Sequence, residues 1–185
     1  MSVAVPQILL RSETRLSEWT KVVSRKLVMP GRTEAEDYHS LLQADYVSVL
    51  AITEDGRIPL VRQFRPALEK FTLELPGGLL DGNESPQQAA LRELNEETGL
   101  QSLSDLHPLG CLMPDTGRLE NRLWGFVARV GTTEIATWHP EPGMERLLVR
   151  PQQLHEWILR GKFDHALHIA IIGLAVMHNR FEWND

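Results

Sequence analysis

The chain contains a single cysteine, Cys111, so no internal disulfide can form among its 185 residues. An excess of basic charge is also absent: the formal net charge is −6, whereas a general nucleic-acid binder would present a basic face. The apolar run over residues 169–177 is too short to span a bilayer and is typical of a buried helix. The first residues, MSVAVPQILL, include Pro6 and lack the positively charged segment of a secretory signal. The sequence therefore predicts a cytoplasmic protein with no membrane span and no nucleic-acid partner.

What is present is the composition of an ordinary globular protein, with 24% charged and 42% hydrophobic residues. A length of 185 residues suits one domain with an extension and allows a sizeable core. Apolar and β-branched segments between turn signals predict strands over residues 17–29, 36–43, 46–53, 57–63, 71–75, 105–113, 121–130 and 146–149. The third and fourth of these strands are predicted to form a hairpin around residues 54–56.

Two helices are predicted near the C-terminus. One begins after Arg150 with a proline and ends at Gly161, and the other takes Asp164 as its N-cap and runs to about Asn179. Together with the strands, they predict an α/β fold in which a mixed sheet lies between helices.

A cluster of carboxylates lies on a further predicted helix within residues 78–100, GLLDGNESPQQAALRELNEETGL. Residues three and four apart are neighbours on a helix, so Glu93 shares a face with Glu96 and Glu97. Like charges at this spacing oppose helix formation by about 0.2–0.5 kcal/mol per pair, so the arrangement does not serve the helix itself. Mg²⁺ binds through a few such carboxylates and keeps other positions for water and substrate phosphate. Arg92, one turn before Glu96, is placed to orient that carboxylate.

The helix that carries this cluster is marked at both ends. Ser85 is a suitable N-cap, Pro86 fits the first helical position, and Gln88 completes a capping box. Gly99 is a natural residue to end the helix, because glycine adopts the left-handed conformation without steric cost. The buried face, from which the glutamates are expected to point away, comprises Ala90, Leu91, Leu94 and Thr98.

A solvated acidic helix face is ordinarily the commoner explanation of the pattern E-x-x-E-E, but here every fixed position of a longer motif is present. Gly78, Glu84 and residues 92–100 (RELNEETGL) match the Nudix box, G-x5-E-x7-R-E-U-x-E-E-x-G-U, in which U is apolar. By this motif the chain resembles the Nudix family. The resemblance implies a hydrolase of nucleoside diphosphates linked to another group, with a loop–helix–loop metal site in an α/β/α sandwich.

A second resemblance concerns the substrate. Residues 61–78 (VRQFRPALEKFTLELPGG) are similar to a segment of ADP-ribose pyrophosphatases and related nucleoside-diphosphate-sugar hydrolases within this family. An N-terminal antiparallel β extension, here residues 1–45, is typical of homodimers in that group, which exchange it or pack it across the two-fold axis. Residues 46–185 would then form the hydrolase domain. Residues 114–118 (PDTGR) depart from the usual ADP-ribose version, which leaves the sugar open.

The resemblance also implies which residues hold metal ions. Glu93 and Glu97 occupy the ligand positions, Glu96 stands beside them, and the carbonyl of Gly77 joins them from the preceding loop. Glu84 takes an orienting role outside the ligand set. Mg²⁺ is the expected cofactor, with Mn²⁺ as an alternative. The cations would neutralise the diphosphate and lower the pKa of bound water.

A general base is expected in the loop that leads into the strand over residues 146–149, within HPEPGMERLLV. The family carries a catalytic glutamate there, and Glu145 is favoured over Glu141 because it lies closer to the strand. Glu96 is counted with these catalytic carboxylates as well as with the metal ligands. An exposed loop glutamate without a catalytic role remains the alternative for both loop residues.

Substrate contacts are assigned from the same resemblance. Arg65 lies in the match to the R-Q-F-R segment, where a guanidinium can bind a phosphate or the terminal ribose. Trp19 corresponds to an aromatic residue that stacks on the base, although a packed strand aromatic is an equal alternative. Tyr38 would supply the second face of that stack from a partner subunit. Glu74 and Arg118 are further candidates for contacts with substrate.

The function that follows is Mg²⁺-dependent hydrolysis of the pyrophosphate bond of ADP-ribose or a related nucleoside diphosphate sugar, giving a nucleoside monophosphate and a sugar phosphate. GDP-mannose or another sugar nucleotide is the close alternative. A non-catalytic Nudix module that binds nucleotide to regulate a partner is a second alternative, although such modules typically lose carboxylates of the box and this chain retains all of them. Hydrolysis of nucleoside triphosphates is disfavoured by the R-Q-F-R segment and by the N-terminal extension.

Overall fold

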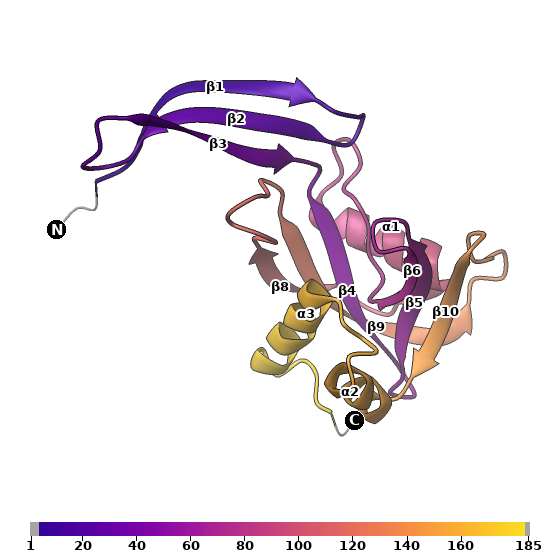
Figure 1. The fold of residues 1–185 in the computed structure, drawn as a ribbon. Coiled ribbons are helices and arrows are strands. Elements are labelled where there is room, and N and C mark those ends of the chain that lie inside the picture. The colour runs from indigo at the N-terminus through magenta and orange to yellow at the C-terminus, as the bar shows by residue number, and fades with distance from the viewer. Residues whose placement is uncertain (1–3, 184–185) are drawn as a thin grey trace. The chain divides into compact units, whose positions relative to one another are not determined.

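The computed structural model describes residues 4–183, over which the chain forms ten strands and three helices (Figure 1). Their contacts divide the chain into two units, Met1–Asp45 with Met113–Arg122, and Tyr46–Leu112 with Leu123–Asp185. The elements are β1 (Gln7–Arg15), β2 (Lys21–Val28), β3 (Ala35–Leu42), β4 (Tyr46–Thr53), β5 (Ile58–Arg65), β6 (Lys70–Glu74), α1 (Pro86–Thr98), β7 (Leu100–Ser102), β8 (His107–Leu112), β9 (Leu123–Glu134), β10 (Met144–Val149), α2 (Pro151–Leu159) and α3 (Ala166–Met177).

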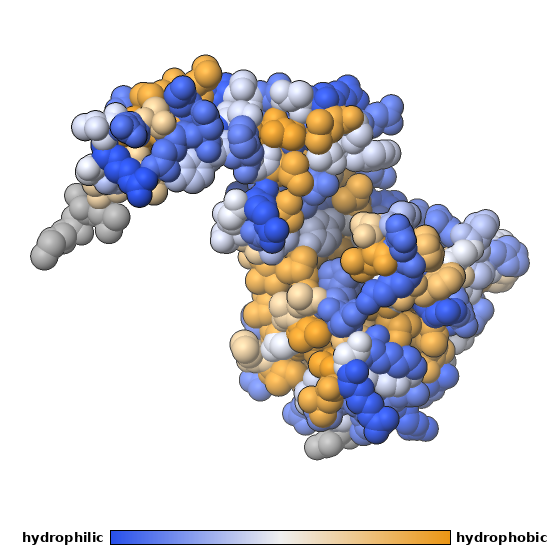
Figure 2. Space-filling model, viewed as in Figure 1, coloured by the Kyte–Doolittle hydropathy of each residue, from blue (hydrophilic) through white to orange (hydrophobic). Residues whose placement is uncertain are grey.

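The first unit is an antiparallel sheet in the order β1-β2-β3. Strand β1 was not expected from the sequence, and neither was the contact of the loop over residues 113–122 with β3, in which Leu41 N–H donates to Arg118 O. Val23 is the one buried hydrophobic side chain in the described part of this unit. Apolar residues instead lie on its surface, as Figure 2 shows; among them are Ile8, Leu9, Leu10 and Leu16. A sheet with so small a core gains little stability from its own packing.

The second unit holds two sheets. In one, β4 pairs with β9 in parallel, while β7 and β8 pair with β9 in antiparallel fashion. In the other, β5 lies between β10 and β6, and all neighbours are antiparallel. The predicted hairpin of β4 and β5 is therefore wrong: the turn between them closes, with Thr53 N–H donating to Arg57 O at 2.8 Å, but the strands enter different sheets. β4 is buried on both faces, which is typical of a parallel strand whose two faces are both covered.

Alternation along β4 builds the sandwich. Leu50 and Ile52 face one core, which they share with α3, whereas Val49 and Ala51 face a second core shared with α1. Because successive side chains of a strand point to opposite faces, one buried strand supplies both cores. The sheet consequently lies between helices, with α1 on one face and α3 on the other.

The helix signals in the sequence are mostly confirmed. Helix α1 begins at the N-cap Ser85 with both hydrogen bonds of the capping box, and it ends at Gly99, whose φ is 67°. The N-cap of α3 is wrong by one residue: His165 takes that place, while Asp164 pairs with Lys70 at 2.9 Å. Among the described residues, no helix is long and apolar enough to cross a membrane.

Candidate active site

Glu97 lies on the buried face of α1, where it was not expected. It is 8% exposed, and the other buried residues of the helix are Ala89, Ala90, Leu94 and Thr98. Its Oε2 accepts a hydrogen bond of 2.8 Å from the backbone N–H of Gly77. Burial raises the pKa of Glu97 to about 8, and the negative charges of Glu93 and Glu74 add to that rise against the Gly77 bond. A buried carboxyl with this pKa is ready to exchange its proton for a cation.

The glycines before α1 bring the backbone up to these carboxylates. A Cβ on Gly78 would overlap the carboxylate of Glu93, and a Cβ on Gly77 would overlap the carbonyl oxygen of Val47. Only glycine at position 77 therefore allows the loop to approach the β4 backbone so closely, while a side chain at position 78 would displace the Glu93 carboxylate. Burial also raises the pKa of Glu93, although Arg92 lowers it in part.

Arg92 is the centre of an ion-pair network on the outer side of this site. Its guanidinium contacts Glu84 at 2.7 Å, Glu93 at 2.8 Å and Glu96 at 3.1 Å, and it donates to the carbonyl of Leu79 at 3.1 Å. The predicted pair of Arg92 with Glu96 is thus confirmed. Glu84 in turn accepts from the N–H of Asp81 at 2.7 Å, so the loop before the helix is bound to the helix.

Six of the predicted metal, substrate-binding and catalytic residues line one cavity of about 320 Å³ in the second unit. They are Arg65, Glu74, Gly77, Glu93, Glu97 and Glu141. We call this cavity the acidic cavity. The carboxylate of Glu96, which is 56% exposed, lies outside its lining and beside Arg92.

Arg65 is held in the wall of the acidic cavity by Glu74. The guanidinium donates to both carboxylate oxygens, at 2.7 and 2.6 Å, and the hydroxyl of Thr72 donates to one of them at 2.6 Å. Although burial raises it, the pKa of Glu74 is held down to about 2 by these donors. Glu74 is therefore an ionised group that orients Arg65 and whose oxygens are already engaged.

Two histidines of the same wall were missed as site residues, because their spacing matches no zinc motif. The rings of His165 and His168 stack at 3.7 Å, and His168 Nδ1 accepts from the N–H of Leu75 at 3.0 Å. Donor atoms of Glu74, His165 and His168 lie within 4.8 Å of one another. These residues do not fit a metal ion, since the remaining nitrogen of His168 must carry its proton and Glu74 is bound to Arg65. Burial lowers the pKa of His168 to about 3, so its imidazole is neutral near neutral pH.

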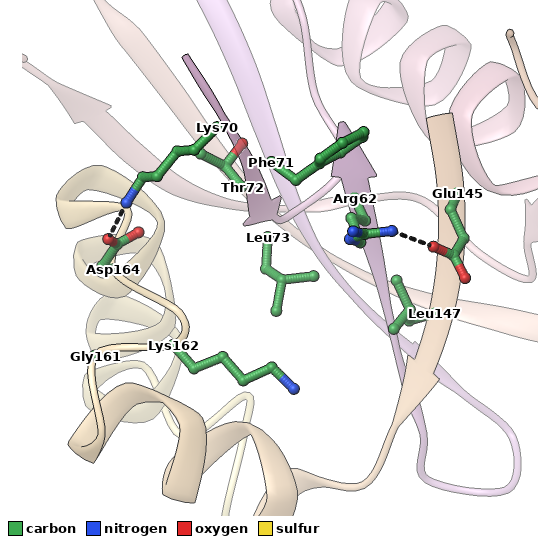
Figure 3. A pocket seen from close by; sticks show the side chains of 10 residues that line it. All are labelled: Arg62, Lys70, Phe71, Thr72, Leu73, Glu145, Leu147, Gly161, Lys162 and Asp164. Atoms are coloured by element: carbon green, nitrogen blue, oxygen red, sulfur yellow. Dashed lines mark hydrogen bonds and ion pairs between the residues drawn. The ribbon is translucent and has the colours of Figure 1, made fainter. Parts of the chain in front are cut away.

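The two candidate bases line different cavities. Met144 lines the acidic cavity together with Glu141, while the next residue, Glu145, points to the other face, as alternation along β10 requires. There Glu145 pairs with Arg62 at 3.0 Å in the wall of a different cavity of about 430 Å³ (Figure 3). The structure thus brings Glu141 to the acidic cavity and gives Glu145 a cationic partner elsewhere.

The other predicted substrate contacts belong to the first unit. Trp19 lies at the bend between β1 and β2 and is 66% exposed. Tyr38 and Arg118 line a common cavity of about 320 Å³ between β3 and the loop over residues 113–122. Arg118 pairs with Asp115 at 2.6 Å, and the Tyr38 hydroxyl donates to Glu36 at 3.0 Å.

The donor set in the acidic cavity fits a hard divalent cation. Glu93 and Glu97 present carboxylate oxygens one helical turn apart, and the Gly77 loop brings backbone against them. Oxygen donors of this kind, with room left for water and phosphate, are those that Mg²⁺ accepts. Burial is the main cause of the raised pKa of both glutamates and neighbouring carboxylates add to it, so a bound cation would stabilise their ionised forms.

Cation binding is expected to release a proton, because a ligating carboxylate must be ionised. The pKa of Glu97 is about 8 in the fold against an ordinary 4.5, so affinity for Mn²⁺ should rise with pH up to about 8 and then level off. In the cation-free protein the raised pKa stabilises the fold fully below pH 4.5, and that contribution is lost as the pH rises through 8. Calorimetric titrations with Mn²⁺ near neutral pH, in two buffers of different ionisation enthalpy, measure the release. Equal heats in both buffers would contradict it, and Glu97→Gln is the control that removes it.

Comparison with known proteins places this geometry in a family. The model of the NUDIX domain matches residues 42–168. A solved structure of an ADP compounds hydrolase superposes with a TM-score of 0.79 at 22% identity, covering 98% of this chain and 100% of that one. The predicted α/β fold with an N-terminal β extension is thereby confirmed.

Curated relatives share parts of the sequence. An ADP-ribose pyrophosphatase of Mycobacterium tuberculosis is 46% identical over 136 residues, which cover 71% of this chain and 64% of that protein. An ADP-sugar pyrophosphatase of Mus musculus is 35% identical over 119 residues, covering 57% and 55%. An ADP-ribose pyrophosphatase of Bacillus subtilis is 53% identical over 53 residues, covering 29% of each. The chain thus spans between about a third and two thirds of the length of these relatives.

Proposed function

This chain belongs to the NUDIX family, and from that premise we propose that it hydrolyses the pyrophosphate bond of ADP-ribose or a related nucleoside diphosphate sugar. The products are a nucleoside monophosphate and a sugar phosphate, and the cofactor is Mg²⁺ or Mn²⁺. The observation that carries the proposal is the acidic cavity, in which Glu93 and Glu97 share one space with Arg65 and Glu141. The names of the similar pyrophosphatases support the substrate class.

The candidate metal ligands and Arg65 have separate tasks in this reaction. Glu93 and Glu97, with Glu96 and the Gly77 carbonyl, would hold the divalent cations, which neutralise the diphosphate and lower the pKa of bound water. Arg65, oriented by Glu74, binds a phosphate oxygen through its guanidinium.

Bond cleavage requires a group that accepts a proton. Water adds to one phosphorus, the bridging P–O bond breaks, and the proton of the attacking water passes to Glu141. We therefore assign the general base to Glu141, the loop glutamate that lines the acidic cavity. Glu145 instead pairs with Arg62 at 3.0 Å in the wall of the other cavity.

A substrate panel tests the proposal. ADP-ribose, GDP-mannose, other sugar nucleotides and nucleoside triphosphates are compared with Mg²⁺, Mn²⁺ or excess EDTA, and phosphate is measured after coupling to a phosphatase. Turnover of ADP-ribose or another sugar nucleotide with either metal supports it. Binding of these nucleotides without turnover would show a regulatory module instead. GDP-mannose stays the second candidate substrate, because residues 114–118 depart from the usual ADP-ribose version.

Trp19 is proposed to stack on the nucleobase, a role that suits its exposed ring. Stacking on an aromatic ring is worth ~1–3 kcal/mol per base in nucleic-acid sites, so Trp19→Ala should raise KM roughly ten-fold or more. The effect on kcat should be smaller, because the base is bound alike in the ground state and the transition state. Unchanged KM for both ADP-ribose and GDP-mannose would remove Trp19 from the site. Steady-state kinetics of the variant provide the measurement.

We also propose a homodimer in which the N-terminal strands pack against or exchange with a second subunit, so that Tyr38 reaches the base from the partner. The support is the first unit itself, where Val23 alone of the described hydrophobic side chains is buried and apolar residues of β1 are exposed. Deleting residues 1–43 is expected to give monomers or insoluble protein with reduced activity. Light scattering of the intact protein and of the deletion variant measures this, and a fully active monomer of the intact chain would contradict it. The expected cytoplasmic location stays a prediction.

A further inference from the structure

The segment that follows β9 bonds to the C-terminal end of α1. The last carbonyls of a helix have no partner within the helix and must be satisfied from outside. Here the indole N–H of Trp138 donates to the carbonyl of Glu96 at 2.8 Å, and the backbone N–H of Ile135 donates to the carbonyl of Gly99 at 2.9 Å. Arg146 on β10 donates to the carbonyl of Thr98.

Two further contacts hold the Trp138 ring. The guanidinium of Arg146 lies over it at 4.6 Å from the ring centroid, a distance at which a cation is attracted to an aromatic face. The ring also covers Gly99, where an added Cβ would come to 2.5 Å from it. The backbone N–H of Trp138 also donates to Ile135 O at 2.8 Å, which closes a turn at the same place.

This anchor lies close along the chain to the proposed base. Residues 139–143 are all that separates Trp138 from the start of β10, and Glu141 is in the middle of them. On the C-terminal side of Glu141, the backbone N–H of Met144 donates to Glu141 O at 2.9 Å. A chain extends by at most about 3.3–3.6 Å per residue, so the two anchors keep Glu141 within about 10 Å of each.

We propose that Trp138 is a positioning residue that binds the Glu141 loop to the end of α1 and so holds Glu141 in the acidic cavity. The inference rests on the proposed function, in which Glu141 accepts the proton. The helix that supplies Glu93 and Glu97 is then also the support of the base, and both halves of the site share one rigid element. A displacement of about 1 Å between reacting groups can cost 10²-fold in rate, which gives such a support its value.

Trp138→Phe removes the indole N–H and keeps an aromatic ring. Loss of one hydrogen bond that maintains the geometry should lower kcat roughly five-fold, and KM should change little because the change affects proton transfer rather than binding. Trp138→Ala, which also removes the ring, should lower kcat further. Trp157→Phe is the matched control. Trp157 lies on α2, outside the acidic cavity, with the Lys162 ammonium over its ring, and the kcat of this variant should equal that of the unaltered protein.

The decisive measurement repeats Trp138→Phe in a Glu141→Gln background, with the full chain, Mg²⁺ and the best substrate of the panel. If Trp138 acts through Glu141, its substitution lowers kcat in the unaltered protein and has almost no further effect once Glu141 is glutamine. The same fold loss in both backgrounds would overturn the inference, since the tryptophan would then act independently of the base. So would unchanged kcat in Trp138→Phe and Trp138→Ala.

These outcomes separate the inference from its premise. If Glu141→Gln alone retains kcat, the assigned base is wrong and the inference fails with it. If Glu141→Gln loses activity but the Trp138 variants do not, only the inference fails. Thermal unfolding of each variant, followed without substrate, identifies any loss of kcat that comes from a smaller folded fraction.

Discussion

Replacing Glu97 with glutamine is expected to lower kcat by on the order of 10²-fold or more, because an interaction with developing transition-state charge is lost. The change keeps the size of the side chain and its place beside Gly77. It removes an ionisable carboxylate from a buried position where the pKa is raised to about 8, and with it a proposed ligand of the divalent cation. The measurement is steady-state kinetics over a range of Mg²⁺ concentrations.

A matched control comes from a glutamate on another helix. Glu156 on α2 pairs with Arg160 at 2.8 Å one turn away and lies outside the acidic cavity, so Glu156→Gln should retain full activity. Exposed pairs of this kind contribute about 0–1 kcal/mol, so the fold should be little affected. Full activity of Glu97→Gln, or of the unaltered protein in excess EDTA, would remove the cation site from the mechanism.

Glu141→Gln should lower kcat by ~10²–10⁴-fold, the usual contribution of a general base, with substrate affinity nearly intact. Glu145→Gln is the paired comparison, because the two residues are close in sequence but face different cavities. Loss of its pair with Arg62 should change kcat by less than about five-fold, since an exposed ion pair contributes about 0–1 kcal/mol.

The reverse result would restore the assignment that the sequence favoured. A large loss in Glu145→Gln with little loss in Glu141→Gln would mean that the loop rearranges when substrate binds, because catalytic hydrogen bonds often form only in the complex. If neither substitution matters, the water is activated by metal ions alone, and this loop has another role.

The sequence by itself determined the elements whose signals are local. Ser85, Gln88 and Gly99 defined α1, since capping depends on residues within one turn of each helix end. The spacing of Arg92 and Glu96 predicted their contact for the same reason, because the helix places residues four apart side by side. The motif carried by that helix also identified the family before any coordinate was known.

Tertiary structure decided everything that depends on how distant segments pair. The sheet in which β4 lies follows from its pairing with β9, in which partners such as Tyr46 and Leu123 are 77 residues apart, and no turn signal encodes that choice. Burial of Glu97 depends on the Gly77 loop folding back onto α1. The helical pattern of the sequence therefore cannot predict the raised pKa of Glu97.

The choice between the two candidate bases is of the same kind. Distance along the chain favoured Glu145, but the alternation of β10 turns the side chain of Glu145 toward Arg62. Glu141, in the loop before β10, lines the acidic cavity. A shift of one residue in a strand reverses the face on which a side chain lies, and that register is set by pairing with β5 rather than by the local sequence. The sequence alone could therefore predict the type of site, while the tertiary structure determines which of the glutamates lie together in the acidic cavity.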